Sequence, residues 1–280
     1  DVYRLEYMGG DITDPANYTE SIIDSKLDEV GGQLDIVYVA NIDDDPADEV
    51  VYSGTPRSTT ALPIAVLDYN DGTFGGGAKY DLAVIDNMAY LFASNGNVYP
   101  AKYENDRWQV LGELTDVVPT SGSWKSSSVA DIDGDGTKEI LIGEWSGAQS
   151  IRLLQPMNGG LKSTVVVDLS GEALPPRLNG GAMGDIDQDG FMDFVFGSRD
   201  SDGGIYRVEY TGGAIDDPMN YSNARIDELI VPGANQMDVV TIANVDADPE
   251  LEIIYSGTPR TTYPTPIPIA VLDIVTVETT

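Results

Sequence analysis

The sequence predicts an all-β fold made of short antiparallel strands, and three observations support this prediction. Runs rich in Val, Ile, Tyr and Phe recur along the 280 residues, separated by Gly, Asp, Asn and Pro, which is typical of strands joined by turns. No segment shows a sustained helical period, and the best helix candidate, 21–30, is short and ends at a Gly pair. Paired runs recur every 44 to 59 residues, which suits units of four strands. We therefore expect a β-propeller-like array of about five four-stranded blades.

The chain also repeats itself over a longer distance. Residues 3–57 align without a gap to residues 206–260, and about half of the aligned positions are identical. After a small insertion the match resumes at the sequence PIAVLD, which occurs at 63–68 and at 268–273. Residues 1–34 match the second half of a blade, so a half blade is expected there. Within a single domain, 1–280, blades are expected to start near residues 35, 79, 121, 176 and 236.

The composition excludes several classes of function. The chain has 47 acidic and 15 basic residues, a net charge of −32 and a pI near 4.1, so it should repel nucleic acid and anionic lipid. No apolar run approaches the ~20 residues that span a bilayer, so no membrane insertion is expected. His and Cys are absent, which excludes thiolate nucleophiles, Ser-His-Asp triads and zinc sites with His or Cys ligands. No catalytic signature remains, and we expect a protein that is not an enzyme.

Two features indicate the compartment. There is no signal peptide and the chain begins at Asp1, so a processed or excised segment is expected. Asn17 and Asn220 each begin an Asn-Tyr-Thr/Ser sequon, the acceptor pattern of an exported glycoprotein. We expect an extracellular or cell-surface protein.

Four of the five connections between paired strands share one spacing of acidic residues. They span 41–49, 131–139, 185–193 and 244–252; the fifth connection, at 87–88, lacks the acids. Side-chain oxygens at positions 1, 3, 5 and 9, with the backbone carbonyl of position 7, can converge on one hard cation. The predicted ligands are Asn41, Asp43, Asp45, Ala47, Glu49, Asp131, Asp133, Asp135, Thr137, Glu139, Asp185, Asp187, Asp189, Phe191, Asp193, Asn244, Asp246, Asp248, Glu250 and Glu252.

Calcium (Ca2+) is the cation that these loops favour. Without a cation, two carboxylates about 5 Å apart repel by about 3 kcal/mol at an effective dielectric of ~20. Magnesium fits less well because it prefers small octahedra and retains water. An EF-hand would need Glu at position 12, where these loops have Tyr, Ile or Phe within a strand-like run. Asp, Asn and Gly also form turns without metal, an alternative that four loops in register make less favoured.

Position 6 of the loop divides the four into two pairs. Loops 131–139 and 185–193 have Gly there, whereas 41–49 and 244–252 have Pro and begin with Asn. Pro fixes φ where Gly would permit a left-handed turn. We therefore expect the two Gly loops to bind calcium more surely.

The pattern apolar–D-x-D-x-D-G-x-x-D/E–apolar–G resembles the FG-GAP/VCBS family, the repeats of integrin-α-type β-propellers. Its carriers are VADIDGDGTKEILIG at 129–143 and MGDIDQDGFMDFVFG at 183–197, with degenerate copies near 41 and 244. The resemblance implies calcium in the loops between strands and roles in adhesion, carbohydrate binding or scaffolding. The family also contains calcium-dependent polysaccharide lyases, so the resemblance leaves the function open.

Three functions are compatible with these observations. The first is a non-catalytic, calcium-stabilised scaffold or adhesion module that associates with itself head-to-tail into filaments through terminal blade edges, or binds surface glycans or proteins. The second is a lectin-like carbohydrate binder using Trp108, Trp124 and Trp145, although Trp more often packs between blades. The third is a polysaccharide lyase or other glycan-cleaving enzyme, for which no catalytic cluster is evident. Three Arg residues stand out in so acidic a chain, and each is expected to pair with a nearby carboxylate or to be a solvated charge: Arg57, Arg199 and Arg260.

Overall fold

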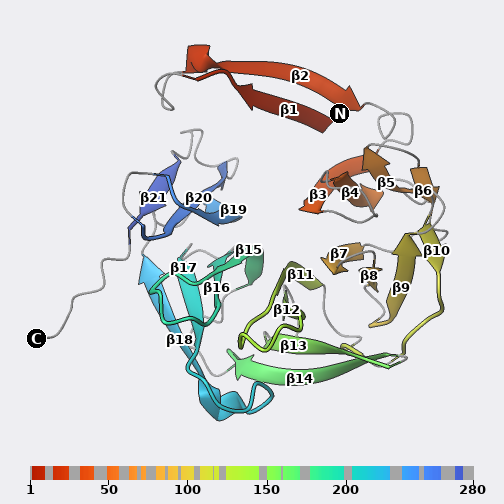
Figure 1. Ribbon diagram of the computed structural model, residues 1–280, viewed down its shortest axis with the longest axis vertical. Helices are drawn as coiled ribbons and strands as arrows, with labels where there is room; N and C mark the ends of the chain where they lie inside the picture. Colours follow the sequence, from red (N-terminus) through yellow and green to blue (C-terminus); the bar gives the residue numbers. More distant parts are fainter. Residues whose placement is uncertain are drawn as a thin grey trace, which may run out of the picture. The chain divides into compact units, whose positions relative to one another are not determined.

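The structure is a computed structural model, and it confirms an all-β chain of antiparallel sheets (Figure 1). It describes residues 2–9, 15–24, 32–40, 49–56, 63–67, 71–73, 80–85, 88–93, 96–103, 108–115, 117–119, 124–144, 150–158, 160–170, 177–198, 204–227, 235–245, 249–259 and 269–273. Within these ranges, the helices are single 3-10 turns, Pro15–Asn17 and Pro218–Asn220. None of the described helices has the length and hydrophobicity that crossing a bilayer requires.

The chain divides into two compact units. The first comprises Asp1–Phe92 and Tyr99–Glu113, and the second comprises Ala93–Val98 and Leu114–Thr280. The candidate site described below lies in the second unit.

The first unit contains a two-stranded and a four-stranded sheet and most of a second four-stranded sheet. The two-stranded sheet consists of β1 (Val2–Tyr7) and β2 (Tyr18–Asp24). The next sheet consists of β3 (Gly32–Ala40), β4 (Glu49–Pro56), β5 (Pro63–Leu67) and β6 (Asp71–Thr73). The last consists of β7 (Tyr80–Ile85), β8 (Met88–Ala93), β9 (Val98–Tyr103) and β10 (Trp108–Val110).

The second unit contains three sheets. The first consists of β11 (Trp124–Ala130), β12 (Glu139–Glu144), β13 (Ser150–Met157) and β14 (Gly160–Asp168). The second consists of β15 (Leu178–Gly184), β16 (Asp193–Ser198), β17 (Ile205–Tyr210) and β18 (Tyr221–Asp227). The third has three described strands, β19 (Asn235–Ala243), β20 (Glu252–Pro259) and β21 (Ala270–Leu272).

Two local expectations differ from the structure. The weak helix candidate at 21–30 is β-structure over its first four residues, because Tyr18–Asp24 pairs with β1 as strand β2. The run at 68–77, whose Asp, Asn and Gly residues predict a Gly-rich turn, contains strand β6, where Asp71 pairs with Ala65. In both places pairing with a neighbouring strand outweighs local propensity.

The long sequence repeat has the same strand register in both copies. Tyr3 pairs with Ile22 in β1–β2, and Tyr206 pairs with Arg225 in β17–β18, so both partners are shifted by 203 residues. In the second copy, the edge of β17 that does not pair with β18 pairs with β16. The hairpin β1–β2 therefore corresponds to the third and fourth strands of a four-stranded sheet.

The core of the second unit includes the whole second strand of two of its sheets. Every residue of β12 and β16 is buried, as expected for strands covered on both faces. Phe194 and Phe196 lie in one apolar cluster with Leu141 and with Ile132, which is the second residue of an acidic loop. The loops are thus attached to the core through an apolar side chain.

In two of the apolar runs, at Gly143 and Gly197, the final glycine lies close to the neighbouring sheet. A Cβ added to Gly143 in β12 would lie 2.2 Å from Leu178 Cδ2 in β15, and one added to Gly197 in β16 would lie 2.4 Å from Met237 Cβ in β19. At Gly197 a larger residue would also clash with backbone oxygens of Met237 and Asn179, whereas at Gly143 the Leu178 side chain would have to move. The motif's last Gly is therefore required by packing between sheets.

Candidate metal centre

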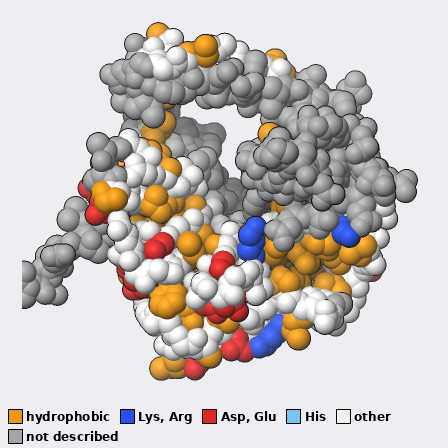
Figure 2. Space-filling view, in the orientation of Figure 1, with side chains coloured by type: hydrophobic (Ala, Val, Ile, Leu, Met, Phe, Trp, Pro, Cys, Tyr) orange, Lys and Arg blue, Asp and Glu red, His pale blue; other side chains and the backbone are white. Residues whose placement is uncertain are grey.

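The two Gly-containing loops connect the first and second strands of neighbouring sheets in the second unit. Loop 131–139 follows β11, and loop 185–193 follows β15. A backbone hydrogen bond from Met192 N to Ile132 O, 3.2 Å long, joins the two loops. On the face shown in Figure 2, Asp and Glu side chains are more frequent than Lys and Arg among the described residues.

The last acid of each loop is a buried structural anchor. Glu139 is 3% exposed and Asp193 is 2% exposed. Glu139 Oε2 accepts a hydrogen bond from Ile132 N at 3.2 Å, and Asp193 Oδ2 accepts one from Ile186 N at 3.1 Å. The position-9 carboxylate thereby closes the loop onto position 2, and one of its two oxygens is used in doing so.

The first acid of each loop caps the turn. Gly136 N donates to Asp131 Oδ2 at 2.9 Å, and Gly190 N donates to Asp185 Oδ2 at 3.0 Å. Both glycines have left-handed φ angles, +91° and +94°, which explains the Gly at position 6. The other oxygen, Oδ1, of Asp131 and of Asp185 is buried and has no hydrogen-bond partner among the described residues.

Carboxylate oxygens converge in both loops. Asp131, Asp133 and Glu139 each offer one oxygen within 4.8 Å of the others. In the second loop, Asp185, Asp187 and Asp189 do the same. Hard oxygen ligands at this spacing, with an unsatisfied buried oxygen on the first residue, fit a divalent cation such as Ca2+.

In both Gly-containing loops, the backbone N–H of position 7 donates to the side-chain carboxylate of position 5. Thr137 N donates to Asp135 Oδ1 at 2.7 Å, and Phe191 N donates to Asp189 Oδ1 at 2.8 Å. These bonds hold the turn between the two positions. Ligation of a cation by the carbonyl oxygens of Thr137 and Phe191 stays a prediction.

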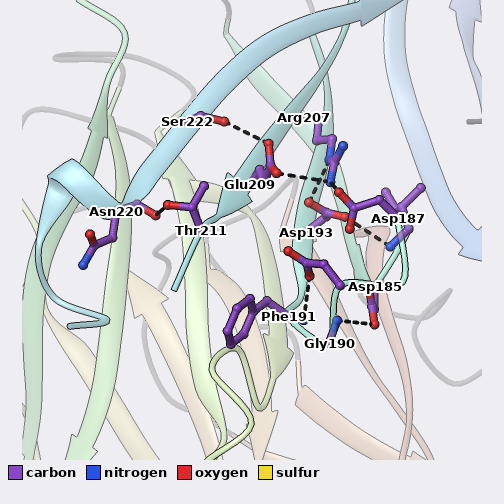
Figure 3. Close-up of polar contacts among 12 residues, drawn as sticks. Asp185, Asp187, Gly190, Phe191, Asp193, Arg207, Glu209, Thr211, Asn220 and Ser222 are labelled. Atoms are coloured by element: carbon purple, nitrogen blue, oxygen red, sulfur yellow. Dashed lines mark hydrogen bonds and ion pairs between the residues drawn. The ribbon is translucent and has the colours of Figure 1, made fainter. Parts of the chain in front are cut away.

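Sequence reasoning missed one residue that contacts the second loop. Arg207, in β17, donates from Nε to Asp193 Oδ1 at 2.7 Å and from Nη2 to Asp187 Oδ2 at 2.5 Å (Figure 3). Burial alone would lower the pKa of Arg207, but the hydrogen bonds to Asp193 and Asp187 outweigh it and the pKa lies above its usual range. The sequence contains one hint of this residue, because the long repeat aligns Arg207 with Arg4.

The buried position-9 acids differ in electrostatics. Burial raises the pKa of Glu139 to about 7; the Ile132 N–H lowers it, and Asp133, Asp135 and Asp131 raise it further. Burial also raises the pKa of Asp193, to about 6, against the lowering effect of Arg207. Without a cation, burial thus disfavours the ionised form of both acids, and Arg207 offsets part of this effect at Asp193.

Stability without metal should therefore depend on pH. Because the pKa of Glu139 lies above its ordinary value of 4.5, the protonated side chain stabilises the fold at low pH, and this contribution is lost as the pH rises through about 7. In chelator, we expect a lower melting temperature at pH 8 than at pH 6 by differential scanning calorimetry. Calcium should shrink or reverse the difference, because it binds the ionised carboxylate.

The substitution Glu139→Gln provides the control for this pH dependence. It removes the titrating group and should flatten the profile between pH 6 and pH 8, whereas Glu113→Gln, at an exposed acid, should leave the profile as in the wild type. Equal melting temperatures at the two pH values in the metal-free wild type would contradict the assignment.

The Pro-containing loop 244–252 shares the position-9 anchor of the Gly loops but holds its turn differently. Pro249 has no N–H to cap the turn, and Asn244 Nδ2 instead donates to the position-7 carbonyl, Glu250 O, at 3.0 Å. Glu252 is 1% exposed, and its Oε2 accepts from Val245 N at 2.7 Å. Asn at position 1 therefore accompanies Pro at position 6 because an amide can donate where a carboxylate cannot.

Several predicted site residues lie outside the described residues. Asp246 and Asp248 are among them, so their part in loop 244–252 stays a prediction. The same holds for the first loop, of which only the backbone of Glu49, at the start of β4, is described. The others in this group are Asn41, Asp43, Asp45, Ala47, Arg57, Trp145, Arg199 and Arg260. Trp108 begins β10 and Trp124 begins β11, and only their backbone is described.

The second sequon has a defined local structure. Asn220 ends the 3-10 turn before β18, and its Nδ2, the atom that a glycan would modify, donates to Ala214 O at 2.9 Å. Glycosylation there would replace one of the two Nδ2 hydrogens, so the hydrogen bond to Ala214 O would have to use the other. Asn17 occupies the corresponding place before β2, and its backbone carbonyl accepts from Met8 N at 2.8 Å.

Comparison with known proteins leaves the family open. No protein-family model matches the chain. No curated protein matches it either. Among solved structures, the N-terminal domain of Nup159 is similar with a TM-score of 0.44 and 10% sequence identity, over 81% of this chain and 63% of that domain. The chain thus spans less than two thirds of the Nup159 domain.

Proposed function

We propose that this chain is a calcium-stabilised β-propeller-type repeat module of the FG-GAP/VCBS kind, serving as a non-catalytic scaffold or adhesion module outside the cell. Its stability, in this proposal, depends on calcium bound in the loop between the first and second strands of a blade. Extracellular modules commonly bind calcium with dissociation constants of ~10⁻⁴ to 10⁻³ M, which suits a calcium-rich surrounding.

One observation carries the proposal. In loop 131–139, three carboxylates from positions 1, 3 and 9 converge within 4.8 Å, and position 9 is almost fully buried. Uncompensated negative charge of this kind destabilises a fold, and a divalent cation would reverse the effect. The repetition of the loop on the next sheet supports a structural role over a single catalytic centre.

The direct test is calcium binding by isothermal titration calorimetry. We expect Asp133→Asn to abolish or weaken by about tenfold or more the tightest calcium site, because it removes a charged ligand from the convergent set. Glu113→Gln removes one negative charge from an exposed place outside the loops and should bind calcium as the wild type does. Identical titrations of the wild type and Asp133→Asn, or no binding at millimolar calcium, would overturn the proposal.

Self-association is the second part of the proposal. Among the described residues, β1 pairs only with β2, whereas the equivalent strand β17 also pairs with β16. An incoming strand of a neighbouring subunit could occupy the corresponding edge of β1 and build a head-to-tail filament. Light scattering on the same calcium-loaded samples should show species larger than the monomer. A monodisperse monomer would contradict self-association.

A further inference from the structure

The side chain of Arg207 lies between two acids of the loop 185–193. It is 14% exposed, and its guanidinium contacts Asp187 at position 3 and Asp193 at position 9, at 2.5 and 2.7 Å. Its next anionic neighbour, Glu209 on the same strand, is 4.0 Å away. Figure 3 shows the guanidinium reaching from β17 into this group of carboxylates. A planar, permanently charged group with several donors is suited to bridging two carboxylates.

The neighbouring loop has an apolar residue at the same place. Val195 pairs with Arg207 between β16 and β17, and the equivalent pair between β12 and β13 is Leu141 with Leu153. Leu153 is fully buried and offers no charge to Glu139. The two loops thus share Asp at positions 1, 3 and 5, an acid at position 9 and the same capped turn. In the second loop Arg207 donates to two of these acids, whereas the equivalent place beside the first loop holds Leu153.

We propose that Arg207 is the resident cation of loop 185–193: it holds that loop closed without metal and weakens its calcium binding, so that of the two Gly-containing loops 131–139 is the calcium-dependent one. The inference rests on the proposed function, in which the loops bind calcium. Arg207 engages one oxygen of Asp187 and the second oxygen of Asp193, whose first oxygen accepts from Ile186 N. Its positive charge also repels a second cation at close range.

The contact between the loops gives this difference a structural consequence. Because Met192 N donates to Ile132 O, the loop held by Arg207 presents a fixed backbone donor to the loop that needs calcium. The arrangement predicts that loop 185–193 stays ordered when calcium is removed, while 131–139 loosens.

The test uses the full chain and calcium alone as the probe. In an Asp133→Asn background, which removes the first site, adding Arg207→Leu should tighten the remaining calcium binding by about tenfold or more. In chelator, Arg207→Leu alone should lower the melting temperature by at least about 5 °C, because the buried Asp193 and the half-buried Asp187 both lose their partner. Arg225→Leu, which removes an exposed Arg from β18 of the same sheet, should change neither value.

The outcomes separate the two proposals. If Asp133→Asn leaves calcium binding unchanged from the wild type, the proposed function fails. If Asp133→Asn weakens binding but the added Arg207→Leu does not tighten what remains, or if Arg207→Leu melts like the wild type in chelator, the role of Arg207 fails. Should Arg207→Leu aggregate, Arg207→Gln, which keeps a polar side chain without the charge, replaces it with the same expected results.

Discussion

Chelation of calcium is expected to lower the melting temperature of this chain by about 5–10 °C for each site that was filled. A site with a dissociation constant near 10⁻⁴ M in about 10 mM calcium contributes about 2.7 kcal/mol, because the ion binds the folded state alone. For a chain of this size, 1 kcal/mol corresponds to roughly 2–4 °C. Differential scanning calorimetry in calcium and in chelator measures the shift.

Magnesium provides the control for this shift. At the same concentration it should restore only a small part of the stability, because it prefers smaller octahedral sites and retains its water. The variant Asp133→Asn should melt at nearly the same temperature in calcium and in chelator, apart from the contribution of any other site. An unchanged melting temperature of the wild type in chelator would contradict stabilisation by calcium.

The substitution Gly197→Ala is expected to destabilise the fold by about 3 kcal/mol or more. The new Cβ would lie 2.4 Å from Met237 Cβ, 2.8 Å from Met237 O and 3.0 Å from Asn179 O. Two of these neighbours are backbone atoms in β15 and β19, so the clash cannot be relieved by rotating a side chain. The melting temperature in calcium should fall by about 6–12 °C.

Gly160→Ala is the matched control for the substitution at Gly197. Gly160 also lies in a strand of the second unit, β14, but a Cβ there would only approach Leu114 Cδ2 at 4.0 Å. This change should stay within about 0.5 kcal/mol of the wild type. If Gly197→Ala were as stable as Gly160→Ala, the close approach of β16 and β19 would be wrong.

Much of the fold was predictable because its signals are local. Runs such as DFVFGS at 193–198 are β-branched or aromatic and end at Gly or Asp, so strand and turn alternate visibly in the sequence. The first strands of the five larger sheets begin at residues 32, 80, 124, 178 and 235; that these sheets are the blades of a propeller stays a prediction. The acidic loops were also predictable, because a turn and its capping acid are close in the chain.

The balance of charge within each loop was not predictable from local spacing. Arg207 reaches Asp193 from 14 residues further along the chain, and only the register between β16 and β17 brings the two together. The same registry places Leu153 beside the other loop. Two loops with the same acidic motif therefore differ in whether an arginine contacts their acids, and the motif itself does not contain this information.

The pairing of Asn with Pro in loop 244–252 was likewise visible but unexplained in the sequence. Pro249 removes the N–H that caps the Gly loops, and the amide of Asn244 closes the turn from the other side. A carbonyl that was expected to bind calcium, that of Glu250, accepts this hydrogen bond. The structural reason for the pairing depends on hydrogen-bond geometry, which residue spacing alone does not contain.

The most direct test of calcium at the strand junction is an anomalous difference map from crystals grown with calcium. We expect a peak between the side chains of Asp131, Asp133 and Glu139, with carboxylate oxygens about 2.3–2.6 Å from its centre. The absence of a peak, with these three side chains turned apart toward bulk water, would contradict it.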